Sequence, residues 1–257
     1  MSRTRNQLFI ACGIFAAAIF VAPSASEAVG LMVLPTASLT VDSNTFPIPL
    51  AFDPNTGIFG VGTFDPVTQQ FSGVQLSDSN FSASINGQLN RDPQINYGIS
   101  VQDTGAPSTF GFVFSMPIVV PATPNIVNAS IGGFLQDSGN DGVSITPTLG
   151  PHVQVANLSN PSTNMGVDVG LVSAFGPNVN PLHSYGSYLA GPQPGPIGAW
   201  TNMSLLLGFT LSGNGDFAVL TGVAQIVPEP SSLVLFGLGM MGLIGYFLRR
   251  RRLTQIH

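Results

Sequence analysis

The amino-acid sequence predicts an all-β exported domain, an antiparallel β-sandwich with jelly-roll-like connectivity, followed by one C-terminal transmembrane helix. Three observations lead to this fold class. Apolar and polar residues alternate over several short segments, as they do in half-buried strands. The chain holds 30 Gly and 21 Pro among 257 residues without a fixed period, which indicates many turns. One uninterrupted apolar run lies near each end of the chain.

The clearest strands lie in the middle of the chain. Apolar residues occupy every second position on both sides of a turn at 90–93, which predicts a β-hairpin over 81–101. A further strand is expected over 110–116, where Phe alternates with smaller residues. A second hairpin is expected from the apolar segments 205–211 and 217–220, because the glycines between them suit a tight turn.

A short repeat supports the turn-rich fold. Residues 52–59 (FDPNTGIF) are echoed by residues 64–71 (FDPVTQQF). In each copy Asp-Pro predicts a type I turn, because proline fixes φ and the aspartate caps the turn. The flanking phenylalanines are expected to point into a core. Two copies fall short of the three repeats that a solenoid needs, so a β-solenoid is the alternative fold.

The N-terminal segment has the features of a signal peptide. Arg3 and Arg5 precede an apolar stretch from Leu8 to Ala22, and small residues follow. Signal peptidase requires small side chains one and three residues before the cut, and Ser26 and Ala28 meet this requirement. We therefore expect cleavage after Ala28, which makes residues 1–28 a signal peptide. An uncleaved membrane helix is the alternative, although the apolar stretch is short for it.

The C-terminal segment predicts a membrane anchor. Residues 233–248 contain no charge, and the next four residues are Arg249, Arg250, Arg251 and Arg252. Sixteen helical residues span about 24 Å, slightly less than a hydrocarbon core of about 30 Å, and flanking residues can supply the rest. An arginine cluster stays in the cytoplasm, so the preceding domain is expected outside it. A buried core helix is the alternative for this run.

Two prolines precede this apolar run. Pro228, Glu229 and Pro230 predict an extended segment at the membrane surface, because proline cannot continue a helix backwards. The order of Pro-Glu-Pro, a short apolar helix and terminal arginines resembles the PEP-CTERM sorting signal of exported bacterial proteins. The resemblance covers residues 227–257. It implies exosortase as the processing enzyme, Pro228, Glu229 and Pro230 as the recognised motif, and Arg249–Arg252 as the cytoplasmic stop. The five residues after the arginines are a small departure from the pattern.

Charge and composition limit what the exported domain, residues 29–226, can do. Its charged residues are ten aspartates and Arg91, so its net charge is −9, which disfavours nucleic acid as a partner. The single cysteine, Cys12, lies in the predicted signal peptide, so no disulfide is expected. The domain has no G-x-S-x-G motif and only His152 and His183 as histidines, so we expect no enzyme.

Two binding possibilities remain open. Asp137 and Asp141 lie in a glycine-rich loop whose oxygens suit calcium, although the loop departs from the EF-hand pattern and a simple polar turn explains it equally. Trp200, Tyr185 and Tyr188 lie in a Gly/Pro-rich stretch where exposed rings could stack on a sugar; core packing of Trp200 is the alternative. No other cofactor is expected.

The functional prediction follows from these features. The chain is expected to be exported as an inner-membrane-anchored precursor and then delivered to the cell surface or extracellular matrix. A structural or adhesive role beside extracellular polysaccharide is the first hypothesis. A lectin-like carbohydrate-binding role, with or without calcium, is the second, and a secreted hydrolase that uses aspartates is the third. Signal peptidase and exosortase are the expected processing enzymes, and the membrane is the expected partner of the C-terminal helix.

Overall fold

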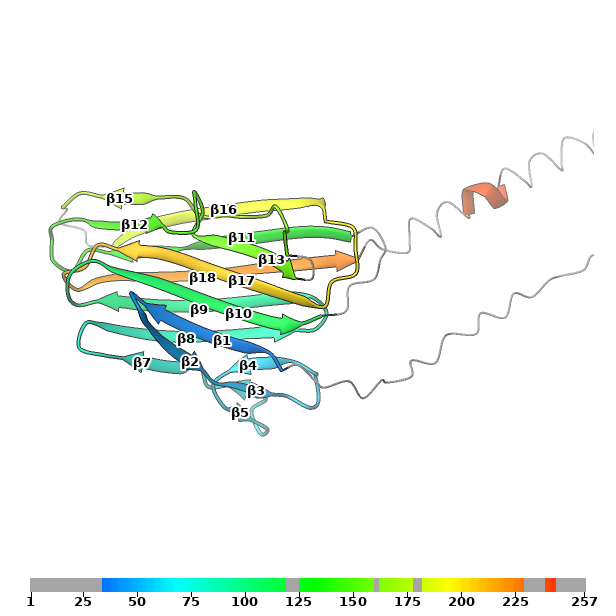
Figure 1. Ribbon diagram of the computed structural model, residues 1–257, viewed down its shortest axis with the longest axis horizontal. Coiled ribbons are helices and arrows are strands. Elements are labelled where there is room, and N and C mark those ends of the chain that lie inside the picture. Colours follow the sequence, from blue (N-terminus) through cyan, green and yellow to red (C-terminus); the bar gives the residue numbers. More distant parts are fainter. Residues whose placement is uncertain (1–33, 119–124, 160–161, 178–181, 229–238, 244–257) are drawn as a thin grey trace, which may run out of the picture. The chain divides into compact units, whose positions relative to one another are not determined.

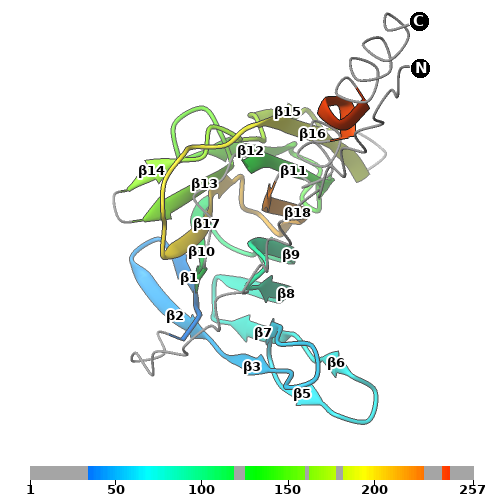
Figure 2. The same cartoon turned by 90° about the vertical axis from the view of Figure 1, so that its right-hand side faces the viewer.

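The computed structural model describes residues 34–118, 125–159, 162–177, 182–228 and 239–243. In this part of the chain, two eight-stranded sheets and one two-stranded sheet form, and every strand pairing is antiparallel (Figures 1 and 2). The predicted antiparallel β-sandwich is therefore confirmed, and the β-solenoid alternative was wrong. The predicted signal peptide, residues 1–28, lies outside the described residues.

The first sheet has the strand order β14-β13-β17-β10-β1-β2, and β12 joins it by pairing with β17 and β15. Its strands are β1 (Thr36–Val41), β2 (Asn44–Ile48), β10 (Ser108–Pro117), β12 (Val143–Pro147), β13 (Gln154–Ser159), β14 (Thr163–Asn164), β15 (Ser173–Phe175) and β17 (Asn202–Leu211).

The second sheet has the order β16-β11-β18-β9-β8-β4-β3, and β7 pairs with β8 beside β4. Its strands are β3 (Leu50–Phe52), β4 (Phe59–Val61), β7 (Val74–Ser77), β8 (Phe81–Asn90), β9 (Gln94–Asp103), β11 (Asn125–Gln136), β16 (Leu182–Pro194) and β18 (Asp216–Pro228). A separate small sheet pairs β5 (Phe64–Asp65) with β6 (Gln70–Phe71).

One hydrophobic core lies between the two large sheets, which Figure 2 shows as two layers. Rings from both sheets meet there: Tyr97 on β9 stacks on Phe114 on β10 at 6.1 Å between centroids. The Tyr97 hydroxyl donates a buried hydrogen bond of 2.6 Å to Oε1 of Gln154 on β13. This pairing satisfies two polar groups that would otherwise be costly to bury. Apolar area and matched polar groups therefore hold the sheets together.

The chain passes between the sheets many times. β9 lies in the second sheet, β10 in the first, β11 in the second and β12 in the first. Such crossings place strands that follow one another in sequence on opposite sides of the core. They give the sandwich its jelly-roll-like character.

The hairpin predicted over 81–101 is confirmed. β8 and β9 pair in register from Phe81 opposite Asp103 to Asn90 opposite Gln94. The alternate apolar residues of both strands are buried in the core, as the period of two requires. The strand predicted over 110–116 is likewise confirmed as the centre of β10, whose three phenylalanines are fully buried.

The second predicted hairpin was wrong, although both of its strands exist. β17 lies in the first sheet beside β10, whereas β18 lies in the second sheet between β11 and β9. The turn contains positive φ angles at Gly213, Asn214 and Gly215, and it carries the chain across the core rather than back beside itself. Alternating apolar residues show which face of a strand is buried, but they do not show which sheet the strand joins.

The two repeated segments form matching turns. Asp53 accepts hydrogen bonds from the Asn55 amide and the Thr56 hydroxyl, and Asp65 accepts the equivalent bonds from Val67 and Thr68. The aspartates therefore cap both turns, as predicted. The flanking phenylalanines instead pair with each other within each copy, and only Phe59 is buried. The expectation that they all enter the core was wrong because these short hairpins lie at the edge of the sandwich.

Candidate functional site

The predicted sorting segment begins at the end of a central strand. β18 is paired on both sides, and its last residue, Pro228, lies opposite Asn125 of β11. Ile226 donates its amide to the carbonyl of Pro93 in the turn between β8 and β9, so the end of β18 is bonded to that turn. Val227 is 39% exposed. Pro228, the first residue of the Pro-Glu-Pro motif, is therefore also the last residue of β18. Figure 1 shows this strand within the second sheet.

Most of the predicted signal lies outside the described residues. Glu229, Pro230 and Arg249–Arg252 belong to this part, as does most of the predicted transmembrane helix 233–248. Residues 239–243 are helical, and the side chains of Met240, Met241 and Leu243 are exposed. Among the residues that the structure describes, no helix combines the length and the apolar character needed to cross a membrane.

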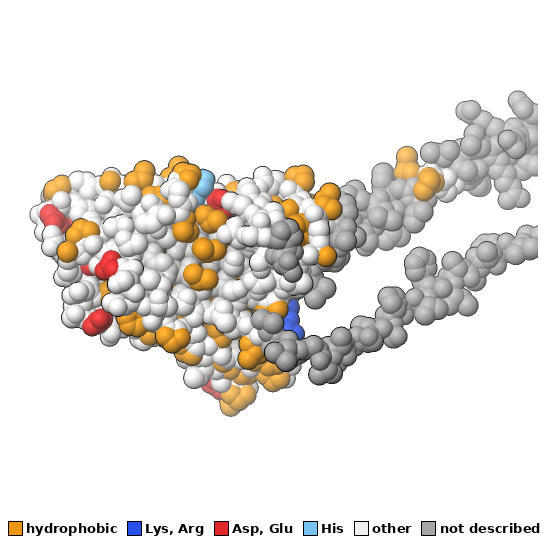
Figure 3. Space-filling view, viewed as in Figure 1, with side chains coloured by type: hydrophobic (Ala, Val, Ile, Leu, Met, Phe, Trp, Pro, Cys, Tyr) orange, Lys and Arg blue, Asp and Glu red, His pale blue; other side chains and the backbone are white. Residues whose placement is uncertain are grey.

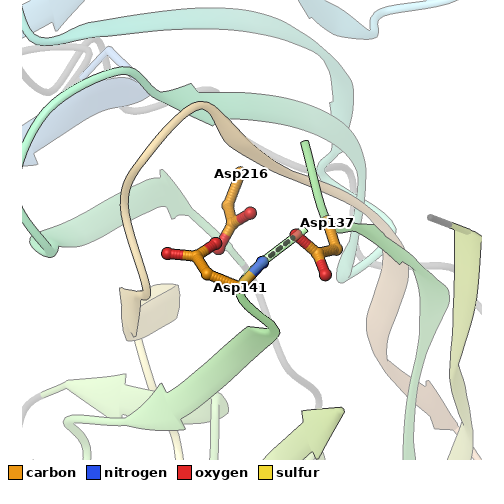
Figure 4. A group of neighbouring side chains, drawn as sticks. All are labelled: Asp137, Asp141 and Asp216. Carbon is orange, nitrogen blue, oxygen red and sulfur yellow. Dashed lines mark hydrogen bonds between the residues drawn. The ribbon is translucent and has the colours of Figure 1, made fainter. Parts of the chain in front are cut away.

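Three carboxylates gather at the other end of β18 (Figure 4). Asp137 follows β11, Asp141 lies in the loop before β12, and Asp216 begins β18. One oxygen from each lies within 4.8 Å of the others. Asp137 and Asp216 are buried, whereas Asp141 is exposed. The structure thus brings together the two predicted calcium candidates and adds a third residue from 75 positions further along the chain, where local spacing gives no signal.

Hydrogen bonds account for much of this arrangement. Asp137 accepts the amides of Asp141 and Gly142, at 3.3 and 3.0 Å, so it caps the loop. Asp216 accepts the Ser138 amide and the Ser212 hydroxyl. Burial raises the pKa of Asp216, and the charges of Asp137 and Asp141 raise it further, against the effect of its hydrogen bonds. The three oxygens could hold a hard cation such as calcium, which remains a prediction.

A further buried carboxylate, that of Asp103, lies beside this cluster. Asp103, at the end of β9, is opposite Asp216 in the sheet register and is fully buried. It accepts the amides of Ser108 and Gly105 and the Ser108 hydroxyl. Burial also raises its pKa above the ordinary value. Glycoside hydrolysis pairs one carboxyl group of raised pKa with a second that stays ionised, whereas both of these pKa values are raised, and both carboxylates are buried and accept loop amides.

The prediction that Trp200, Tyr185 and Tyr188 present exposed rings to a sugar is corrected by the structure. Trp200 is 5% exposed and Tyr185 only 2%, so both rings belong to the core and offer no face to a sugar. The Tyr185 hydroxyl donates to the Leu171 carbonyl, and its ring packs against that of Tyr188 at 5.3 Å. Tyr188 is partly buried against the core. The alternative expectation for Trp200, packing in the core, is therefore confirmed.

The two histidines and Arg91 lie against other parts of the fold. The His183 ring stacks on Phe175 at 4.5 Å, and Nδ1 of His152 is covered without a hydrogen-bond partner among the described residues. The guanidinium of Arg91 lies 5.6 Å from the centre of the Phe59 ring. Figure 3 shows acidic side chains in a few separate places on one face, with mostly uncharged side chains between them.

Comparisons with known proteins bear on the C-terminal segment. No curated protein matches the chain. The solved structure of infectious bursal disease virus Gt strain is 15% identical over 76% of this chain and 65% of that chain, with a TM-score of 0.15. The structure of T=1 particles derived from infectious bursal virus is 13% identical over 79% of this chain and 61% of that chain, with a TM-score of 0.13. The chain thus spans less than two thirds of either, and at these TM-scores neither likeness supports an argument.

The family model of the PEP-CTERM protein-sorting motif matches residues 227–252. The match includes the Pro-Glu-Pro residues, the apolar run and the four arginines from which the sequence predicted it. Such a motif marks an exported protein that is first made as a membrane-anchored precursor. Exosortase then processes this precursor. The chain therefore carries a PEP-CTERM protein-sorting motif directly behind the last strand of an antiparallel β-sandwich.

Proposed function

We propose that the chain is the precursor of a structural or adhesive protein of the cell surface or extracellular matrix, associated with extracellular polysaccharide. The observation that carries the proposal is the PEP-CTERM protein-sorting motif at residues 227–252, because it gives the domain a destination outside the cytoplasm. In this proposal, signal peptidase cuts after Ala28, and residues 233–248 hold the precursor in the inner membrane until exosortase acts.

The folded domain suits a passive role in a matrix. Its core is continuous between two large sheets, and its surface is rich in uncharged polar residues. The buried carboxylates Asp103 and Asp216 hold loops in place, so the domain is proposed to act by binding rather than by catalysis. A lectin-like role is the second candidate, and the uncharged amide side chains on the outer face of the second sheet favour it.

Fractionation of a bacterium that secretes polysaccharide tests the proposal. The full chain is produced in a strain with exosortase and in an otherwise identical strain that makes no extracellular polysaccharide. The protein is expected in the matrix fraction of the first strain and in the culture medium of the second. An equal distribution between matrix and medium in both strains would remove the link to polysaccharide.

A further inference from the structure

The outer face of the second sheet carries a group of uncharged amide side chains. Asn86 and Gln88 on β8 are exposed, and Asn96 on β9 lies directly opposite Gln88. These side chains point away from the core, because the apolar residues next to them in sequence on both strands are buried. This part of the sheet therefore presents amide donors and acceptors to solvent and no charge.

The small β5–β6 hairpin lies beside this surface and forms a groove with it. Gln69, Gln70 and Phe71 of the hairpin line one side of a groove of about 360 Å³, and the sheet amides line the other. The Phe71 ring lies so close over Gly60 of β4 that a Cβ at position 60 would overlap it. The Thr63 amide also donates to the Ser72 hydroxyl at 2.9 Å. The hairpin is thus packed onto the sheet, and the groove is formed before any ligand arrives.

The groove is lined by amide hydrogen-bond donors and acceptors. Oδ1 of Asn96 is covered from solvent and has no hydrogen-bond partner among the described residues. Because Oδ1 of Asn96 is covered, a ligand in the groove would pair with the exposed amides of the lining. Gln69, Gln70, Asn86 and Gln88 each add donors and an acceptor around the same space.

The chemistry of the lining selects a class of ligand. The groove is lined by Gln69, Gln70, Phe71, Asn86, Gly87, Gln88, Asn96 and Tyr97, and none of these side chains is charged at neutral pH. Amides pair well with hydroxyl groups, and the partly exposed Phe71 ring offers an apolar face to the C–H groups of a sugar. The negative charge of the domain disfavours acidic polymers.

We propose that this groove binds a segment of uncharged polysaccharide. The inference rests on the proposed association with extracellular polysaccharide and names the site and the ligand class for it. The site is distinct from Trp200 and Tyr185, whose rings are buried in the core.

Binding by the full chain to neutral oligosaccharides tests the proposal. The probes are glucose, galactose and mannose oligomers of about three to six units, with alginate as the acidic comparison. The test variant is Gln88→Ala with Asn96→Ala, and the control is Gln225→Ala, an outward amide on β18 outside the groove. Both variants lie on the outer face of the sheet, and thermal melting confirms that they fold.

The wild type is expected to bind at least one neutral probe and not alginate. The double variant should bind that probe about thirtyfold more weakly, because it loses two hydrogen bonds to the ligand. The control should bind like the wild type. Binding that survives in the double variant, or no binding of any neutral probe, would overturn the assignment. If the double variant still fractionates with the matrix, the groove proposal fails while the proposed function stands; a wild type absent from the matrix contradicts the proposed function instead.

Discussion

At the scale of single residues, the aspartates of this domain serve two opposite purposes. Asp53 and Asp65 cap turns, and hydrogen bonds from Thr56 and from Val67, respectively, lower their pKa values below the ordinary 3.8. Asp103 and Asp216 are buried, and burial raises their pKa values. The first pair stabilises the fold in its charged form, whereas the second pair costs stability when it is charged.

The pH dependence of stability follows from these directions. The pKa values of Asp103 and Asp216 are higher in the folded than in the unfolded chain, so the contribution of these two groups to stability is greatest below the ordinary value of 3.8 and falls as pH rises through the folded values. Asp53 and Asp65, whose pKa values are lowered, contribute stability above 3.8, and this contribution is lost only as the pH falls below that value. The melting temperature is therefore expected to rise when the pH falls from 7.5 to about 4.5.

Asp216→Asn tests which carboxylate is responsible. The substitution removes a buried charge near Asp137 and Asp141, so the melting temperature at pH 7.5 should rise by a few degrees; about 1 kcal/mol corresponds to roughly 2–4 °C for a domain of this size. The rise in melting temperature between pH 7.5 and about 4.5 should be smaller in this variant than in the wild type. Asp78→Asn, at an exposed position, is the matched control and should leave the pH profile unchanged. A variant that melts like the wild type at every pH would contradict this explanation.

The loop role of Asp137 can be separated from a calcium role. Asp137→Ala removes the acceptor for two backbone amides, and the melting temperature should fall in EDTA, because those bonds need no metal. The expected loss is about 1–3 kcal/mol. A calcium titration of the wild type supplies the second measurement. A rise in melting temperature with millimolar calcium, abolished by Asp141→Asn, would show that the cluster also binds the ion.

At the scale of elements, the sequence predicted strands better than it predicted their partners. The alternation over 81–101 and 110–116 identified β8, β9 and β10 because one face of each strand is buried. The same pattern could not assign β17 and β18 to different sheets, since both bury one face in the same core. The site shows the same limit: Asp137 and Asp141 are close in sequence and were found, whereas Asp216 depends on strand register and was missed.

The contact between β11 and β18 tests the arrangement of the second sheet. A Cβ at Gly133 would overlap the carbonyl oxygen of Val219 on the neighbouring strand. Gly133→Ala is therefore expected to force two paired strands apart and to lower the melting temperature by several degrees. Gly176→Ala is the matched control, because a Cβ there meets nothing within 4 Å. Equal melting temperatures of the two variants would mean that the strands do not pair in this register.

At the scale of the whole molecule, the fold and the sorting motif share a residue. Pro228 ends the central strand β18 and begins the Pro-Glu-Pro sequence, so no spacer separates the sheet from the motif. The motif itself could be predicted from the sequence because its three parts are contiguous. The uncharged groove could not, since its lining comes from the β5–β6 hairpin, β8 and β9, which only the folded chain brings together.

Processing of the precursor tests the central claim most directly. The full chain and a variant with Pro228→Ala, Glu229→Ala and Pro230→Ala are produced in one strain with exosortase and in one without it, and the size and location of the product are measured. The wild type is expected to be shortened and released from the inner membrane only where exosortase is present. The triple variant is expected to remain a full-length membrane precursor in both strains. Shortening and release of the triple variant to the same extent as the wild type would contradict sorting through this motif.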